Sequence, residues 1–137
     1  MDGSRGREER EPDPELDRWA REVVDAAIEV HRALGPGFLE STYENALCIE
    51  LEARAVRFRR QVSVAVHYKG RVVGHGQMDL LIRERLIVEL KAVEVLAPIH
   101  SVQLRSYLKA TGLHLGLLIN FNVPQLRQGL RRLVLSP

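Results

Sequence analysis

The sequence is poor in cysteine, in aromatic residues and in long apolar runs, and each shortage excludes a class of protein. Cys48 is the single cysteine among 137 residues, so an intramolecular disulfide and a CxxC zinc or redox site are both excluded. Aromatic residues make up 5% of the chain, which argues against a platform that stacks the bases of a single strand. No apolar run approaches the ~20 residues of a membrane-spanning helix, so we expect no membrane partner and a cytoplasmic location.

Strong charge of one sign is also absent. The formal net charge is +2, with a pI of about 9.0, which is compatible with a nucleic-acid partner but does not by itself indicate one. Residues 1–12 are rich in Arg, Glu, Asp and Gly and contain little to bury, so we expect a disordered leader there. Residues 13–137 have the length and composition of one domain with a single core.

Four segments have the apolar spacing of helices, at about residues 14–34, 41–54, 98–111 and from Pro124 onward. Gly35 ends the first of them, because glycine readily adopts the left-handed conformation that follows a helix. In the second, Ser41 and Glu44 have the spacing of a capping box, which predicts that their side chains bind the first backbone N–H groups. The fourth presents Leu126, Leu130 and Leu133 at helical intervals.

Four other segments are typical of strands, at about residues 62–68, 71–82, 86–92 and 113–121. The last is almost wholly apolar, which favours a central strand covered on both faces. A helical crossover joins the third and fourth strands, so these two strands should be parallel with a right-handed connection. The predicted fold is therefore α/β, with a mixed central sheet of about four strands flanked by helices.

The second and third strands bring two acids and a lysine together. If a three-residue loop joins these strands, Asp79 lies opposite Glu89 and Gln77 lies opposite Lys91, with all four side chains on one face. Directly opposed carboxylates have Cβ atoms ~5 Å apart and repel each other, so they need a counter-charge. Lys91 supplies one positive charge, and a divalent cation would supply two more. Hard oxygen ligands of this kind favour Mg²⁺ or Mn²⁺.

The same residues also fit an ordinary exposed strand face, on which Asp, Glu and Lys form weak cross-strand pairs. A loop one residue longer or shorter would shift the pairing and separate the two acids. The spacing alone therefore leaves both interpretations open.

Several spaced motifs follow one another in a fixed order along the chain. They are Gly37-Phe38-Leu39-Glu40-Ser41-Thr42-Tyr43, then Asp79, then Val88 to Ala92, then Gln103 to Gly112, and last Gly116 to Phe121. With these motifs, over about residues 19–133, the chain resembles the bacterial GxxExxY proteins, a family of the PD-(D/E)xK nuclease superfamily. The resemblance implies a restriction-endonuclease-like core.

The resemblance also implies roles for residues of the acidic hairpin. Asp79 and Glu89 match the two metal-binding acids of the superfamily, and Lys91 matches its catalytic lysine. The backbone carbonyl of Leu90 would be a further metal ligand. The usual Pro-Asp of the motif stands here as Met78-Asp79, a departure that leaves the acid in place.

Three residues outside the hairpin receive roles in the same way. Glu40 resembles the acid that the first core helix of the superfamily contributes to the metal site, although a first-turn acid is also favoured by the helix dipole. Gln103 and Tyr107 resemble a QxxxY pair, four residues apart on one helical face. They would contact substrate phosphate or orient the water on the metal, and a merely packed face is the alternative. Tyr43 is expected to be a wedge between helix and sheet.

Three functions follow from these residues. The first is a nuclease that depends on Mg²⁺ (or Mn²⁺) and hydrolyses phosphodiester bonds, with nucleic acid as partner and DNA as the first substrate class to test. Basic residues near the first hairpin would reach the backbone of that partner: Arg57, Arg59, Arg60, Lys69 and Arg71. The second is a catalytically silent binding or assembly module, in which apolar residues such as Val72, Val73 and Leu96 form a homo-oligomer interface. The third is a metal enzyme that acts on a small phosphorylated molecule in a closed pocket.

Overall fold

The computed structural model of the chain describes residues 14–136, so the expected leader at residues 1–12 lies outside the described residues. The elements follow in the order α2 (Pro14–Leu34), α3 (Glu40–Ala53), β1 (Phe58–Tyr68), β2 (Arg71–Ile82), β3 (Leu86–Lys91), α4 (Pro98–Thr111), β4 (Leu115–Asn120), the 3-10 helix η1 (Leu126–Gly129) and β5 (Leu130–Val134). No helix among residues 14–136 combines the length and the apolar character that a membrane crossing requires.

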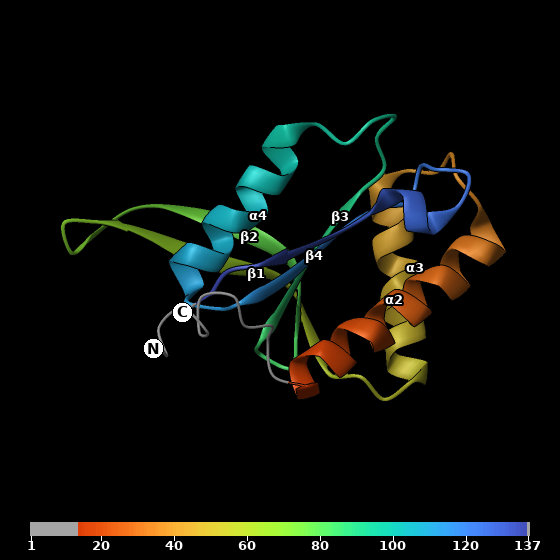
Figure 1. The fold of residues 1–137 in the computed structure, drawn as a ribbon, viewed down its shortest axis with the longest axis horizontal. Helices are drawn as coiled ribbons and strands as arrows, with labels where there is room; N and C mark the ends of the chain where they lie inside the picture. Colours follow the sequence, from red (N-terminus) through yellow and green to blue (C-terminus); the bar gives the residue numbers. More distant parts are fainter. Residues whose placement is uncertain (1–13, 137) are drawn as a thin grey trace, which may run out of the picture.

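The molecule has three layers, with one central sheet between helices (Figure 1). Helices α2 and α3 pack on one face of the sheet, where residues such as Val23, Leu47 and Leu90 form the larger core. Helix α4 packs on the other face, where Leu104 and Leu118 belong to a second core. The α/β fold with helices on both faces of a mixed sheet is confirmed.

The sheet has the strand order β1-β2-β3-β4-β5. Strands β1, β2 and β3 form an antiparallel meander, and β3 is parallel to β4, as the helical crossover predicted. Every residue of β4 is buried, which agrees with its continuous apolar sequence. The ladder between β2 and β3 is short and extends only from Ile82–Leu86 to Leu80–Val88.

The segment after Pro124 is not the helix that its leucine spacing predicted. It forms η1 and then β5, which pairs antiparallel with β4 and gives the sheet a fifth strand. Leu130 packs with the core beneath α2 and α3, whereas Leu133 packs with the core beneath α4. The two leucines therefore lie on opposite faces of a strand. A spacing of three residues fits one face of a helix, and it equally fits the two opposite faces of a strand.

The start of α3 also differs from the prediction. The helix begins at Glu40, its N-cap is Leu39, and no side chain caps it. The expected capping box between Ser41 and Glu44 is therefore wrong. Glu44 is buried and accepts a hydrogen bond from Arg60 on β1 instead.

The hairpin of β1 and β2 extends well beyond the rest of the sheet (Figure 1). Strand β1 has 11 residues and is therefore roughly 36 Å long at ~3.3 Å per residue. Lys69 and Arg71 lie at the tip of this arm, whereas Arg57, Arg59 and Arg60 lie at its base. The basic residues expected to cluster around the hairpin thus form two separate groups.

Candidate functional site

The candidate site lies where β2 and β3 separate. One step beyond the last ladder pair, the side chains of Asp79 and Glu89 replace backbone pairing. Asp79 Oδ2 accepts a hydrogen bond from the backbone N–H of Leu90 at 2.8 Å, and Glu89 Oε2 accepts one from the N–H of Asp79 at 2.9 Å. The β2–β3 register expected from a three-residue loop is present from Ile82–Leu86 to Leu80–Val88, and the side chains of Asp79 and Glu89 bridge the next step. The strands have separated by the following step, and no ladder pair of the described residues joins Gln77 to Lys91.

Burial raises the pKa of both acids. Glu89 is only 4% exposed, and burial, followed by the charge of Asp79, raises the pKa of Glu89 to about 8. Burial is also the largest cause that raises the pKa of Asp79, and the charge of Glu44 acts in the same direction. Both acids therefore resist ionisation, and a cation placed between them would stabilise their ionised forms.

Lys91 is a cation whose charge acts on both of these acids. It ends β3, is half-buried, and its charge opposes the rise in pKa of Glu89, Asp79 and Glu40. Its position is fixed by its own backbone, because the carbonyl of Lys91 accepts a hydrogen bond from the N–H of Phe121 at 2.9 Å. Lys91 thus belongs to the same electrostatic cluster as the acids.

Glu40 is brought to this cluster from the other side of the site. It is the first residue of α3, and burial raises its pKa, opposed by the charge of Lys91 and assisted by that of Asp79. The Gly35–Phe38 turn that leads into α3 is fastened by Tyr43, whose hydroxyl donates to the carbonyl of Gly35 at 2.6 Å. Tyr43 is fully buried and stacks on Phe121, so it is the expected wedge.

Sequence reasoning missed two residues that join this cluster. Glu44 is only 7% exposed and accepts hydrogen bonds from Arg60 Nε at 3.1 Å and from Gln61 Nε2 at 2.9 Å. The same Gln61 amide reaches Asp79 Oδ1 at 3.5 Å. Glu44 follows Glu40 by four residues and so shares its helical face, a signal that the apparent capping pattern obscured.

The two members of the QxxxY pair lie on α4 and differ in their surroundings. Tyr107 lies against β2, where its hydroxyl accepts a hydrogen bond from the N–H of Gln77 at 3.3 Å. A Cβ atom on Gly76 would come within 2.5 Å of the Tyr107 ring, so glycine provides the space for this contact. Gln103 lies on α4, is exposed, and within residues 14–136 makes no hydrogen bond to the acids.

Asn120, on the neighbouring strand β4, supports the site, and it was not identified from the sequence. It pairs with Lys91 across β3 and β4 and is only 2% exposed. Its side chain accepts from the N–H of Val93 at 3.0 Å and donates to the carbonyl of Val93 at 2.9 Å. Asn120 therefore fixes the course of the chain immediately after Lys91.

The donor set agrees with a hard divalent cation. Within residues 14–136, no group of three or more His, Cys, Asp and Glu side chains is arranged to hold a metal. Asp79 and Glu89 nevertheless supply two carboxylates at one gap, and their pKa values are raised by burial first and then by the charge of a neighbouring acid. Two carboxylates completed by backbone oxygen and water are ligands that Mg²⁺ accepts.

Comparison with known proteins agrees with this geometry. A family model described as the PD-(D/E)XK nuclease superfamily matches residues 17–133. The crystal structure of SSO0001 is similar with a TM-score of 0.54 and 21% sequence identity, over 90% of this chain and 63% of that chain, so this chain spans less than two thirds of its length. At this identity the likeness concerns the fold alone. No curated protein matches the chain significantly. Because the family model covers most of the sequence, the chain belongs to the PD-(D/E)XK nuclease superfamily.

Proposed function

We propose that this protein is a nuclease that hydrolyses the phosphodiester bonds of nucleic acid with a divalent metal, Mg²⁺ or Mn²⁺, and that DNA is its first substrate class. Proteins of the superfamily typically use divalent metals. One observation carries the proposal: a buried carboxylate, Glu89, and a half-buried one, Asp79, meet beside Lys91 where β2 and β3 separate. An ordinary exposed strand face would leave both acids open to solvent.

The residues that would hold the metal come from two elements. Asp79, Glu89 and the carbonyl of Leu90 would bind it from the β2–β3 gap, and Glu40 would approach from the start of α3. When bound, a divalent cation lowers the pKa of a water molecule and stabilises negative charge on a phosphate. The raised pKa values of these acids explain why the site would favour a cation strongly.

Lys91 would act on the attacking water and on the phosphate. Its ammonium group lies within electrostatic range of all three acids, so it can orient a water molecule and stabilise the oxygen that develops charge. Asn120 would keep the end of β3 in place through its bonds to Val93. Tyr107 and Gln103, on α4, would contact the substrate backbone as the reacting phosphate enters.

We also propose that the chain belongs to the GxxExxY family within the superfamily, and the geometry of the turn before α3 supports this proposal. Gly37 has φ +108°, a conformation that favours glycine. The hydroxyl of Tyr43 accepts from the N–H of Phe38 at 3.1 Å and donates to Gly35, which fastens this turn. This turn places Glu40 at the first position of α3. The three residues of the motif thus form one structural unit that presents an acid.

The test is a cleavage assay with a matched lysine control. Plasmid, linear duplex DNA, single-stranded DNA and RNA would each be incubated with Mg²⁺, Mn²⁺ or EDTA. Wild-type protein and Lys69→Ala, which removes a lysine at the hairpin tip, should cleave with metal, and Lys91→Ala should not. Absence of cleavage by the wild type, with metal binding confirmed, would overturn the proposal, and cleavage that survives in Lys91→Ala would reject the assigned site.

A second function, a catalytically silent assembly module, is favoured by the surface of the hairpin arm. Tyr68, Val72 and Val73 are 64%, 53% and 62% exposed near its tip. Leu96, by contrast, is half-buried against the core beneath α4 and does not belong to this surface. Under this function, light scattering of the purified protein would show an oligomer that Val73→Lys dissociates, and Lys91→Ala would leave that oligomer intact.

A further inference from the structure

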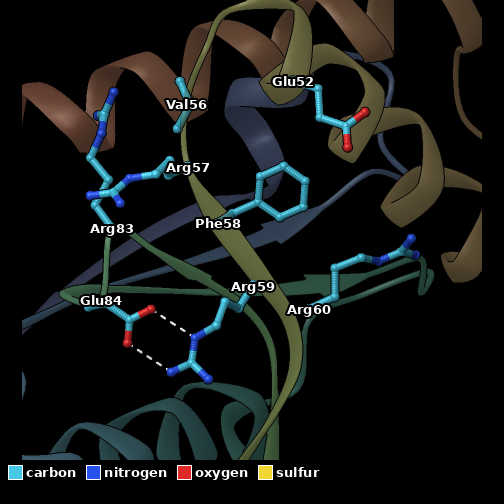
Figure 2. Close-up of a pocket in the computed structure, with 8 residues that line it drawn as sticks. All are labelled: Glu52, Val56, Arg57, Phe58, Arg59, Arg60, Arg83 and Glu84. Atoms are coloured by element: carbon cyan, nitrogen blue, oxygen red, sulfur yellow. Dashed lines mark hydrogen bonds and ion pairs between the residues drawn. The ribbon is translucent and has the colours of Figure 1, made fainter.

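A basic hollow lies at the base of the hairpin arm, outside the acidic site. It has a volume of about 810 Å³ and is lined by Glu52, Val56, Arg57, Phe58, Arg59, Arg60, Arg83 and Glu84. Figure 2 shows the Phe58 ring among these side chains, with Arg57 and Arg83 on one side and Arg60 on the other. Four arginines against two glutamates give the hollow an excess of positive charge.

The hollow adjoins the acidic site through consecutive residues of one strand. Arg60 lines the hollow and also donates to Glu44, while the next residue, Gln61, donates to Glu44 and contacts Asp79. Arg57 precedes Gln61 by four residues, roughly 13 Å along an extended chain at ~3.3 Å per residue. A nucleic-acid strand advances ~3.4 Å per nucleotide, so this distance corresponds to about four nucleotides.

Two arginines of the hollow differ from the others in their partners. Arg57 makes no ion pair within residues 14–136, so its charge is available to a ligand. Arg59 donates to both carboxylate oxygens of Glu84, each at 2.8 Å, and both side chains are more than half exposed. A guanidinium group binds a phosphate in the same forked geometry, and an exposed pair of this kind contributes little to stability. The Glu84 carboxylate therefore binds Arg59 in the way that a phosphate would, and a phosphate can displace this carboxylate.

We propose that this hollow binds the sugar–phosphate backbone of the nucleic-acid substrate about four nucleotides from the bond that is cut, with Arg57 and Arg59 on phosphates about two nucleotides apart and Glu84 as the group that the substrate displaces. The proposal rests on the proposed nuclease function, because that function places the reacting phosphate at Asp79 and Glu89. It assigns a specific path to the strand: from the acids, past Arg60, into the hollow. The hairpin tip lies at the far end of β1 and is not on this path.

The experiment measures binding without cleavage. Fluorescence anisotropy would follow a fluorescein-labelled 20-base-pair DNA duplex and the matching single strand with the full-length Lys91→Ala protein in Mg²⁺, over a range of salt concentrations. In that background, Arg57→Gln and Arg59→Gln should each weaken binding roughly threefold to tenfold and reduce the salt slope by about one unit. Glu84→Gln should strengthen binding roughly twofold to fivefold, because it frees Arg59. Lys69→Gln and Arg71→Gln remove the same charge at the hairpin tip and should change affinity less than twofold.

Each outcome decides the assignment. Equal weakening by the tip variants and the hollow variants would show a general effect of charge and would overturn it, as would unchanged binding in Arg57→Gln and Arg59→Gln. Weaker binding in Glu84→Gln would show that this glutamate supports the hollow and would reject the displacement. A failure of the nuclease function itself is distinct, because it appears as absent cleavage by wild-type protein that still binds DNA.

Discussion

Asp79 and Glu89 hold each other in place, since each carboxylate binds a backbone N–H on the strand that carries the other acid. These two bonds extend the β2–β3 hairpin by one step with side chains in place of backbone. Each carboxylate uses one oxygen for this bond. The second oxygen of Asp79 also accepts from the Gln61 amide at 3.5 Å, and the second oxygen of Glu89 can bind a cation. The arrangement combines rigidity with repulsion, because the buried Glu89 and the half-buried Asp79 are fixed close together.

The first prediction concerns pH and the metal-free protein. Glu89 has a pKa of about 8 in the folded chain against 4.5 for its ordinary value. Between these values the folded protein binds more protons than the unfolded chain, so the free energy of unfolding must fall as pH rises. One pKa unit corresponds to about 1.4 kcal/mol, and we expect a loss on the order of 3 kcal/mol from pH 5 to pH 8. Urea denaturation in EDTA measures it.

Two glutamine variants separate Glu89 from general charge effects. Glu89→Gln removes the titrating group and should flatten the profile between pH 5 and pH 8. Glu84→Gln is the control, because Arg59 lowers the pKa of Glu84 and this acid titrates below that range. Parallel profiles for the wild type and Glu89→Gln would refute the assignment, and Mg²⁺ should flatten the wild-type profile if the site binds it.

The second prediction concerns the amide of Gln61, which joins Glu44 to Asp79. Gln61 has φ +52°, a conformation that costs a non-glycine residue roughly 1–2 kcal/mol. Gln61→Ala and Gln61→Gly both remove the amide and should weaken Mn²⁺ binding by about tenfold or more, as loss of a group that orients a ligand does. Gln61→Gly should be more stable than Gln61→Ala by about 1 kcal/mol, because glycine relieves the backbone.

Calorimetric titration with Mn²⁺ and urea denaturation test both halves of this prediction. Ser63→Ala, an exposed change two residues further along β1, is the control and should alter neither quantity. Unchanged Mn²⁺ affinity in both Gln61 variants would show that the amide does not position Asp79.

The third prediction concerns Asn120, whose side chain satisfies both backbone polar groups of Val93. Asn120→Ala takes this partner from the two groups of the half-buried Val93 and should lower the free energy of unfolding by about 1 kcal/mol. It should also lower kcat more than it raises KM, since it loosens the chain that follows Lys91. The neighbouring change Asn122→Ala is the control. An Asn120→Ala protein with unchanged kcat would show that Asn120 stabilises the fold but does not position Lys91 for catalysis.

Much of the site could be predicted because its geometry is local. A three-residue loop and two strands set the pairing of Asp79 with Glu89, and both the loop and the strands are visible in sequence. The position of Glu44 could not be predicted, since a nearby serine suggested a capping box and the true partner, Arg60, lies on another element. Long-range contacts of this kind leave no periodic signal.

The fate of the C-terminal segment shows a second limit of the sequence. Leu126, Leu130 and Leu133 fit a helical spacing, yet β4 offers an open edge that β5 completes. Hydrogen bonding to a neighbouring strand decides between the two structures, and that neighbour is known only from the fold. The prediction of an α/β architecture remained correct despite this error, because β5 adds to one edge of the sheet and does not alter its centre.

The last prediction concerns the contact between Gly76 and Tyr107. A Cβ atom at residue 76 would come within 2.5 Å of the Tyr107 ring, while one on Gly74 would meet nothing within 4 Å. Gly76→Ala should therefore displace the ring and break its bond to the N–H of Gln77 at modest cost in stability, because the ring is only half-buried. We expect cleavage to fall roughly tenfold, as misplacement of a substrate-positioning group does.

A double-mutant cycle decides whether Gly76 acts through Tyr107. If it does, Gly76→Ala should reduce cleavage in the wild type but have no further effect in a Tyr107→Ala background, because the displaced group is already gone. Gly74→Ala should leave cleavage unchanged in both backgrounds. An equal loss from Gly76→Ala with and without the tyrosine would mean that this glycine serves β2 itself, and Tyr107 would then lose its assigned role as the group that α4 presents to the substrate.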